Sequence, residues 1–321
     1  MTRTWGFSKR APDQVPSSAG EQLMAGPSPE TDLVIDLRAP SGAQVTGLRR
    51  VLLGGCAVDL VMADDLWRLM DGHLGRPRGT GCLLVASANL DHLAHFGEMV
   101  DGDDMDPGHM EDWLVLLDGI PLVQVARRLT GTAYPRLAGA DLLPDFLGLA
   151  ESRQSSVAVL GGSPALREPL AAAMARQWPR LNLVCHLTPP RDDLLDEQAC
   201  RRIQQELASH RVDLLVVALG KPLQEQWIAK YANGTGALVA VAFGAAVDFM
   251  AGTIPRAPRW MRDHGLEWAY RLAREPRRLS RRYLVQSPRA LRMLYANSAI
   301  PALPRPAADP QPAEPRIRAD Q

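Results

Sequence analysis

Short apolar runs alternate with longer helical patterns along most of this chain. The runs have the length and β-branched content of buried strands and occupy 81–86, 113–117, 157–160, 181–185, 214–219 and 237–243. Helical patterns stand between them, at 63–70, 142–149, 164–178, 196–210 and 224–231. An earlier run at 49–56 is interpreted as a first strand or a strand with its loop. The alternation predicts an α/β fold with a largely parallel, Rossmann-like sheet flanked by helices.

The stretch 212–243 predicts a strand, a helix and a second strand in one crossover. The first apolar run stops at Gly220-Lys221-Pro222, and Asn233-Gly234 turns the chain before the second run. In an open α/β sheet, ligands bind beyond the carboxyl ends of the strands. We therefore expect the loops 220–224 and 244–248 to face one crevice.

The residues after Gly252 are strongly basic. Arginines recur three, four and seven positions apart, and Trp268 and leucines stand between them. This spacing predicts a basic amphipathic helical appendage over 253–298. Guanidinium groups bind phosphate oxygens in a bidentate fork, so anionic lipid headgroups, pyrophosphate and nucleic acid are all chemically possible ligands of this segment.

The two ends of the chain differ from its middle. Residues 1–45 and 299–321 are rich in proline, serine, alanine and charge, and are expected to be a flexible extension and a disordered Pro-rich tail. The α/β catalytic core is accordingly expected at 46–252. There is no secretory h-region and no window of about 20 apolar residues that could span a membrane, so a cytoplasmic location is expected.

Composition narrows the classes of function. Lysine plus arginine and aspartate plus glutamate number 36 each, so no global field favours a nucleic-acid partner. The four cysteines lack C-x-x-C spacing, which indicates reduced core thiols. Asp101-Gly-Asp103 superficially matches the D-x-D of metal-dependent transferases, but we interpret it as an acidic surface loop. No metal site and no cofactor are expected.

Polar residues follow two of the predicted strands directly. Ser87 and Asn89 follow the run at 81–86, and Asp118-Gly119 follows the run at 113–117. A carboxylate at such a position suits a general base, while a turn or helix-capping aspartate is the other reading. Asn89 is likewise either a ligand contact or the cap of the following helix. The residues alone leave both alternatives open.

Two further positions carry candidate phosphate chemistry. Arg136 is suited to bind phosphate oxygens, while Asp141 is expected to cap the helix 142–149. Gly161-Gly162 precedes a predicted helix, where free N–H groups bind phosphate. The full G-x-G-x-x-G of dinucleotide oxidoreductases is missing, which disfavours that class.

Four ordered motifs carry a family resemblance: G-x-P-x-Q-E from Gly220, G-x-x-x-D-F-x-x-G from Gly244, R-A-P-x-W from Arg256 and G-L-E-W-x-x-R-L-x-x-E-P-x-R from Gly265. On these residues the chain resembles the WecG/TagA/CpsF family of bacterial glycosyltransferases, glycosyltransferase family 26. The resemblance covers about 49–283.

The resemblance implies an inverting, metal-independent transfer of a hexose from a UDP-sugar to a polyprenyl-pyrophosphate-linked saccharide. Family donors are UDP-linked hexoses, N-acetylmannosamine or its uronic acid, and an enzyme of exopolysaccharide synthesis using UDP-glucose or a related UDP-hexose is favoured. The basic appendage would then attach the protein peripherally to the inner face of the cytoplasmic membrane. In the family, the D-G at Asp118 supplies the proposed general base, and Ser87 stands where threonine is usual. Arg136 to Asp141 match the family's R-x-x-G-x-D, which makes Arg136 a candidate to hold the leaving diphosphate.

The residues expected to bind substrate are Ser87, Asn89, Arg136, Gly161, Gly162, Gln224, Asp248, Arg256, Arg259, Arg271, Arg278 and Arg281. Gln224 is expected to hydrogen-bond sugar or nucleotide, and Glu225 to cap its helix or order the loop. The seven histidines are assigned no catalytic role. The sequence leaves open which of these arginines bind diphosphate and which bind the membrane.

Two other classes stay open. One is a non-catalytic scaffold at the membrane surface in a polysaccharide assembly complex. The other is a nucleotide-dependent oxidoreductase, which is suggested only by the stretch 157–163. A homo-oligomer is possible in any of these cases, and a nucleic-acid binder leaves the G-x-P-x-Q-E loop unexplained.

Overall fold

A computed structural model of the chain describes residues 48–97 and 113–301, all of which lie in one compact unit, Val34–Gln321. The acidic Asp101-Gly-Asp103 loop, the extension 1–45 and most of the predicted tail lie outside the described residues. The domain boundaries predicted from the sequence stay predictions.

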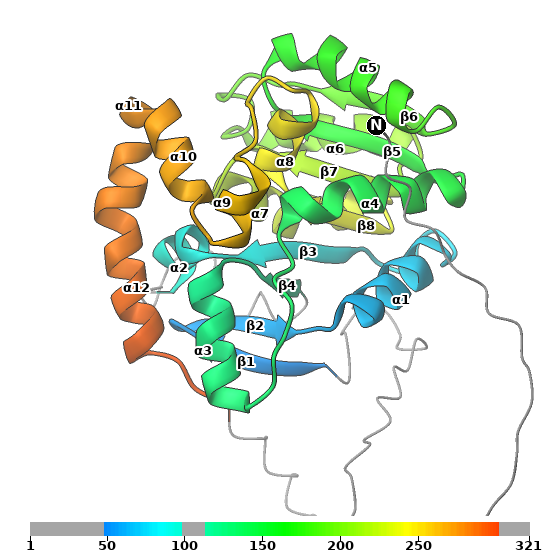
Figure 1. The fold of residues 1–321 in the computed structure, drawn as a ribbon. Coiled ribbons are helices and arrows are strands. Elements are labelled where there is room, and N and C mark those ends of the chain that lie inside the picture. Colours follow the sequence, from blue (N-terminus) through cyan, green and yellow to red (C-terminus); the bar gives the residue numbers. More distant parts are fainter. Residues whose placement is uncertain (1–47, 98–112, 302–321) are drawn as a thin grey trace, which may run out of the picture. The chain divides into compact units, whose positions relative to one another are not determined.

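An eight-stranded sheet forms the centre of the described structure (Figure 1). Its order is β1-β2-β4-β3-β8-β7-β5-β6, and the pairs from β4 through to β6 are all parallel. The predicted α/β class with a largely parallel sheet is thereby confirmed. The strands are β1 (Arg49–Leu53), β2 (Cys56–Leu60), β3 (Leu83–Ala88), β4 (Trp113–Leu117), β5 (Ser156–Gly161), β6 (Asn182–Leu187), β7 (Leu214–Ala218) and β8 (Val239–Ala242).

Two apolar layers cover the two faces of the sheet. Successive residues of one strand enter opposite layers: in β4, Trp113 and Val115 join one cluster while Leu114 joins the other. Because both faces are covered, the strands read as continuous apolar runs. The first layer is closed by α2 (Leu90–Phe96), α3 (Ile120–Thr130), α6 (Glu197–Ser209) and α7 (Leu223–Tyr231).

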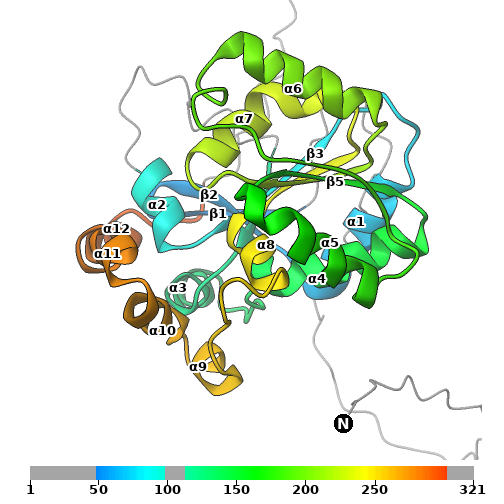
Figure 2. The same ribbon diagram turned by 90° about the horizontal axis from the view of Figure 1, so that it is seen from above.

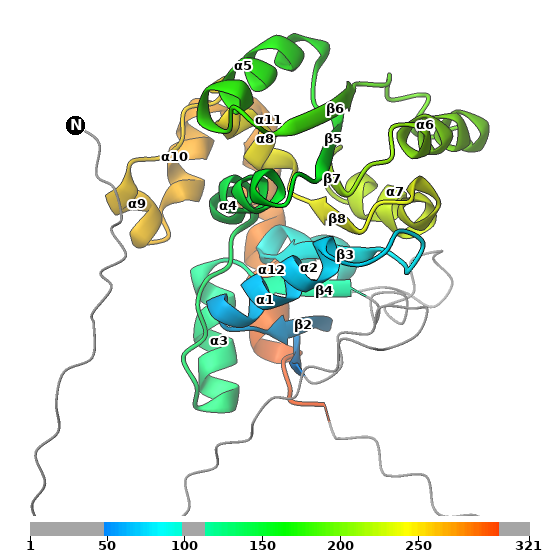
Figure 3. The same ribbon diagram turned by 90° about the vertical axis from the view of Figure 1, so that its right-hand side faces the viewer.

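The second layer lies on the opposite face, as the views in Figure 2 and Figure 3 show. It is closed by α1 (Ala63–Leu74), α4 (Gly139–Ser152), α5 (Arg167–Gln177) and α8 (Gly244–Met250). Short 3-10 turns precede α5 and follow α7, at η2 (Pro164–Leu166) and η3 (Ala232–Thr235). Side-chain caps start α2 and α6, where Asn89 and Asp196 accept a backbone N–H three residues on.

The first predicted strand is in fact a β-hairpin. Gly54 and Gly55, both with positive φ, turn the chain between β1 and β2. β2 is not evident from the apolar pattern of the sequence, because Asp59 interrupts that pattern. That carboxylate is buried yet satisfied, since Arg50 on β1 donates to it at 2.8 Å and the Val115 N–H on β4 donates to it at 2.8 Å.

The predicted crossover is confirmed, because β7 and β8 are parallel neighbours joined through α7. The two loops expected to share a crevice also meet. A Cβ built on Gly244 would stand 2.7 Å from Oε1 of Gln224 and 3.7 Å from the backbone N of Gly220. The carboxyl ends of these strands thus bring the two loops together.

The C-terminal segment is helical, as expected, but it is broken into several pieces. These are α9 (Arg259–Asp263), α10 (Glu267–Arg274), α11 (Pro276–Ser280), a π-helical segment η4 (Arg281–Gln286) and α12 (Ser287–Ala296). In Figure 1, α12 runs beside α2 and α3. Ala290 and Leu294 are fully buried against the first layer, and Ala299 pairs with Leu52 of β1. The end of the segment therefore belongs to the packed core.

No helix in the described ranges is both long enough and apolar enough to cross a membrane.

Candidate active site

The ends of β3 and β4 form the centre of the candidate site. Ala88 pairs with Leu117, and the Asp118 N–H donates to the Ala88 carbonyl at 2.8 Å. Since parallel strands end at the same edge of a sheet, Asn89 and Asp118 come side by side directly beyond this pair. The sequence placed both residues correctly at strand ends.

Asn89 has two hydrogen bonds with different roles. Its Oδ1 accepts from the His92 N–H at 3.1 Å, which caps α2, and its Nδ2 donates to Oδ2 of Asp118 at 3.3 Å. Capping is thus confirmed. It coexists with a contact to the candidate base, so the two readings of Asn89 do not exclude each other.

Asp118 is not a helix cap. The residue at the start of α3 is Gly119, with φ of 92°, and that end of the helix has no side-chain cap. The Asp118 side chain is 17% exposed, and burial raises the pKa of its carboxyl above the ordinary 3.8. Arg136, the Asn89 hydrogen bond and Lys221 act in the opposite direction, while Glu267 raises the pKa further. A half-enclosed carboxylate of raised pKa is suited to accept a proton.

Arg136 lies between two aspartates. Its Nη1 is 3.9 Å from Oδ1 of Asp118 and its Nη2 is 2.9 Å from Oδ2 of Asp141. The prediction that Asp141 caps α4 is wrong, because the N-cap is Ala138 and has no side-chain hydrogen bond. Asp141 stands in the first turn and also pairs with Arg256 at 2.7 Å and Arg262 at 3.4 Å. It joins the C-terminal segment to α4.

Two of the C-terminal arginines expected to bind substrate lie against the aromatic ring of Phe249. The guanidinium carbons of Arg256 and Arg271 stand 5.6 and 5.5 Å from the centre of the Phe249 ring. Burial raises the pKa of neighbouring Asp248, against the nearby charges of Arg278 and Arg271. The structure thus brings together four of the expected residues. Arg259 and Arg281 are exposed, on α9 and at the start of η4.

The G-L-E-W turn between α9 and α10 lies against the active-site edge. A Cβ on Gly265 would meet Cδ1 of Ile120 at 2.7 Å, so this turn packs on the first residue of α3, two positions after Asp118. Further along, Arg282 pairs with Asp91 of α2 at 3.1 Å. Neither Glu267 nor Arg282 was singled out from the sequence, although the G-L-E-W motif contains the glutamate.

Gly161 and Gly162 stand at the carboxyl end of β5, both with positive φ. Three strands, β3, β8 and β7, separate them from β4 and Asp118. With about 4.8 Å between neighbouring strands, that places them about 19 Å away along the edge. The Gly161 carbonyl is 2.9 Å from Nε2 of His186. The structure therefore does not bring this glycine pair next to the candidate base.

Gln224 is 3% exposed, at the start of α7. Its Nε2 donates to the Ala242 carbonyl and to Oε1 of Glu225, each at 3.1 Å. Only its Oε1 has no hydrogen-bond partner among the described residues. Contact of Gln224 with a sugar or nucleotide stays a prediction, and the geometry restricts it to accepting a hydrogen bond.

A buried ion pair next to Gln224 was overlooked in the sequence. Lys221 Nζ is 2.6 Å from Oε1 of Glu225, and the two side chains are 9% and 0% exposed. The expectation that Glu225 orders the loop fits this contact. The i,i+4 spacing of Lys221 and Glu225 was visible in the sequence, but their burial was not.

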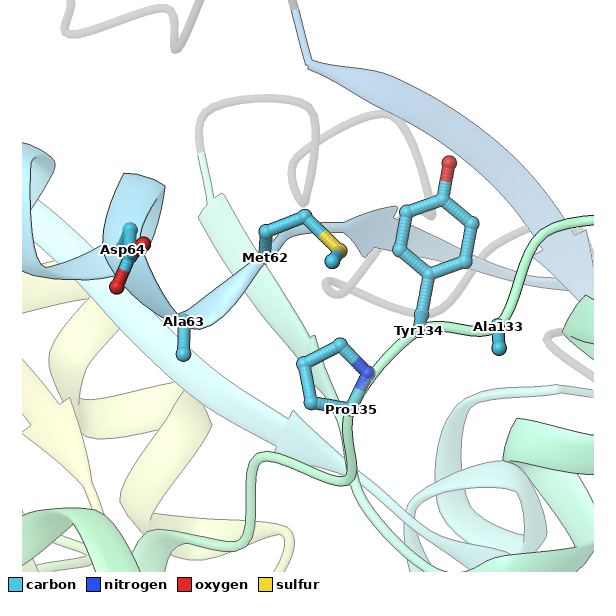
Figure 4. A pocket seen from close by; sticks show the side chains of 6 residues that line it. All are labelled: Met62, Ala63, Asp64, Ala133, Tyr134 and Pro135. Atoms are coloured by element: carbon cyan, nitrogen blue, oxygen red, sulfur yellow. The ribbon is translucent and has the colours of Figure 1, made fainter. Parts of the chain in front are cut away.

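The described residues contain no group of three histidine, cysteine or carboxylate side chains placed to hold a metal ion. All four cysteines are free thiols. A surface pocket of about 380 Å³ lies elsewhere, between the start of α1 and the segment before Arg136. Figure 4 shows Met62, Tyr134 and Pro135 around this hollow, and it contains none of the predicted site residues.

Fold and site together define an α/β protein whose candidate base stands at the carboxyl edge of a parallel sheet, beside a cluster of arginines. The model of the glycosyl transferase WecG/TagA/CpsF family matches residues 51–302, and the chain belongs to this family. That confirms the resemblance seen in its motifs.

Curated relatives are similar over part of their length. An N-acetylglucosaminyldiphosphoundecaprenol N-acetyl-beta-D-mannosaminyltransferase of Bacillus subtilis (strain 168) is 27% identical over 167 residues, 52% of this chain and 63% of that protein. Proteins of the same description from Bacillus spizizenii and Staphylococcus aureus (strain MW2) are 30% and 28% identical to this chain, again over 167 residues and 63% of each relative. The matched part thus spans less than two thirds of these relatives.

Proposed function

We propose that the protein is an inverting glycosyltransferase that moves a hexose, or an N-acetylhexosamine or its uronic acid, from a UDP-sugar to a polyprenyl-pyrophosphate-linked saccharide. The observation that carries the proposal is Asp118: a carboxylate of raised pKa at the edge of a parallel sheet, held by Asn89 and next to Arg136. Family membership supports the reaction class.

Asp118 would act as the general base. Its carboxylate takes the proton from the acceptor hydroxyl while the oxygen attacks the anomeric carbon and the bond to the UDP oxygen breaks. The electron pair leaves with the diphosphate. A single displacement of this kind inverts the anomeric centre, and it needs one carboxylate rather than two.

Arginines would neutralise the charge that develops on the leaving diphosphate. Arg136 is the one nearest the base, and Arg256 and Arg271 stand together over Phe249. Each guanidinium group can bind two phosphate oxygens at once, so these arginines can supply the positive charge without a metal.

The remaining predicted contacts would hold the donor's nucleotide. The positive-φ turn at Gly161 and Gly162 would lie against the nucleotide at the end of β5, with the Gly162 N–H already donated to the Ala218 carbonyl at 3.0 Å. Gln224 has one buried acceptor oxygen beside Gly244. Because about 19 Å of sheet edge separates β5 from β4, the donor would have to lie extended along this edge.

The exposed C-terminal surface suits a membrane. Large apolar side chains at Trp260, Trp268, Leu284 and Val285 are 47–65% exposed, within a segment rich in arginine. Each arginine near an anionic leaflet contributes about 1 kcal/mol, so several give reversible attachment. These features support the proposal that the enzyme works at the inner face of the cytoplasmic membrane, where it would reach lipid-linked acceptors.

The donor remains to be selected by experiment. The relatives named above are N-acetylmannosaminyltransferases acting on a diphosphoundecaprenol-linked N-acetylglucosamine. We extend the acceptor class to this chain and retain exopolysaccharide or another cell-surface polysaccharide as the product. UDP-glucose, UDP-N-acetylmannosamine and its uronic acid form the donor panel.

The test is transfer from these radiolabelled donors to polyprenyl-pyrophosphate-linked acceptors with chelator present. Asp118→Asn should lower the rate about 100- to 10,000-fold without unfolding the protein. Asp71→Asn, which removes a half-exposed carboxylate of α1 paired with Arg153, is the matched control. Transfer from no donor, or an Asp118→Asn variant as active as the control, would contradict the proposal.

A further inference from the structure

The buried Lys221 ammonium is fully occupied by the protein itself. An ammonium group has three N–H donors. Nζ of Lys221 is 2.6 Å from Oε1 of Glu225, 3.1 Å from Nδ1 of His92 and 3.2 Å from the Ser87 carbonyl. No donor is left for a substrate phosphate, so Lys221 is not a ligand of the diphosphate in this arrangement.

The three acceptors belong to different parts of the active-site edge. Glu225 is on α7, which follows β7, whereas Ser87 is the next-to-last residue of β3 and His92 is in the first turn of α2. Ser87 precedes Asn89 by two positions and His92 follows it by three. Lys221 thus holds the chain on both sides of Asn89.

His92 passes the restraint on to Asn89. Because the ammonium donates to Nδ1, the neutral ring carries its proton on Nε2, and burial together with the charge of Lys221 keeps the pKa of His92 well below its usual value. The backbone N–H of His92 in turn donates to Oδ1 of Asn89, whose Nδ2 donates to Asp118. The route from ammonium to candidate base is continuous.

We propose that Lys221, with Glu225 as its counter-ion, is a positioning residue that fixes Asn89 and thereby the orientation and charge of Asp118. The proposal rests on the proposed role of Asp118 as the base. Lys221 makes no contact with substrate and acts through the edge of β3 and α2. The groups facing Asp118 are Arg136, Asn89, Glu267 and Lys221.

The test removes both charges together. Lys221→Met alone would leave the Glu225 carboxylate buried without a counter-charge, which destabilises the fold, whereas Lys221→Met with Glu225→Gln leaves no unpaired charge. Lys230→Met is the matched control, because Lys230 is on α7 with Glu225 but is 57% exposed and pairs with Glu197. Thermal unfolding checks that each variant is folded.

Three readouts are measured: kcat and KM for the donor, and the titration of the Asp118 carboxyl by ¹³C NMR with labelled aspartate. We expect the double variant to bind donor normally and to lose about 100-fold in kcat, as for a misplaced catalytic group. The pKa of Asp118 should rise, since the lowering charge of Lys221 is gone. The Lys230→Met control should match the native protein in all three.

A folded double variant with native kcat and an unmoved Asp118 titration would overturn the proposal and leave Lys221 a purely structural residue. If the native protein transfers no sugar, the proposed function fails, and the Asp118 titration still decides whether Lys221 sets this carboxyl. If the double variant does not fold, Lys221→Gln with Glu225→Gln, which also leaves no unpaired charge and keeps polar side chains at both positions, replaces it. Native kcat in that variant would likewise contradict the proposal.

Discussion

Asn89 donates from Nδ2 to Oδ2 of Asp118 at 3.3 Å, while its Oδ1 accepts the N–H of His92 at 3.1 Å. The cap on α2 therefore sets which end of the amide faces the carboxylate. Because the Asn89 amide is held in this orientation, its Nδ2 hydrogen bond stabilises the ionised form of Asp118 and occupies one of the two carboxylate oxygens. The other oxygen is nearer to Arg136, at 3.9 Å.

Replacing Asn89 with aspartate separates capping from this contact. The new carboxylate still accepts the backbone N–H of His92, so α2 keeps its cap. The amide N–H that donates to Asp118 is replaced by a second negative charge. The pKa of Asp118 should rise. Because a general base must be ionised, the acidic limb of the transfer rate should move to higher pH. The measurement is the pH profile of kcat.

Asn182→Asp, at the exposed start of β6, serves as the control for this change of charge. Its profile should coincide with that of the native protein. An Asn89→Asp profile that also coincides would show that Asn89 does not control the charge of Asp118.

Asp141 is expected to hold the C-terminal segment in place. It pairs with Arg136, Arg256 and Arg262, and its side chain is 36% exposed. Asp141→Ala should therefore cost only about 1 kcal/mol of unfolding free energy. The larger effect should be local: trypsin should cut near Arg256 faster, and the KM for the donor should increase.

Asp145→Ala, one turn further along α4, is the control for the Asp141 variant, with cleavage followed by mass spectrometry. Equal cleavage rates in the two variants would mean that the segment is held by other contacts.

Leu294 tests whether α12 is part of the folded core. It is fully buried in the layer formed with α2 and α3. Leu294→Ala should reduce the free energy of unfolding by about 2–5 kcal/mol, because a cavity would remain in the packing. Tyr295→Ala, at the neighbouring position that is 54% exposed, should cost much less. Similar denaturant midpoints for the two variants would contradict the packing described for α12.

The exposed apolar side chains of the C-terminal segment should govern membrane binding. Trp268→Ser with Leu284→Ser should weaken binding to vesicles containing anionic phospholipid, measured by co-sedimentation. Leu195→Ser, a 70% exposed leucine before α6, is the control. High salt should weaken binding of the native protein, since charges on the surface are screened. Binding unaffected by the double substitution and by salt would locate the membrane surface elsewhere.

Much of the architecture was predictable because it depends on local pattern. The predicted strand 113–117 coincides with β4, and the parallel arrangement follows from alternating strands and helices. From this arrangement alone, Asn89 and Asp118 could be expected at neighbouring strand ends. The hairpin was missed for the converse reason, since the charge of Asp59 is neutralised by Arg50 only across the paired strands.

By itself the sequence determined the fold class, the family motifs and the residue types at the strand ends, because these depend on periodicity and order along the chain. Only the tertiary structure decided that Asp141 anchors arginines, that α12 closes the core and that Lys221 is buried between Glu225, His92 and Ser87. Burial and ion pairing depend on which distant segments meet. A buried charge is stable only with the partners that folding brings to it.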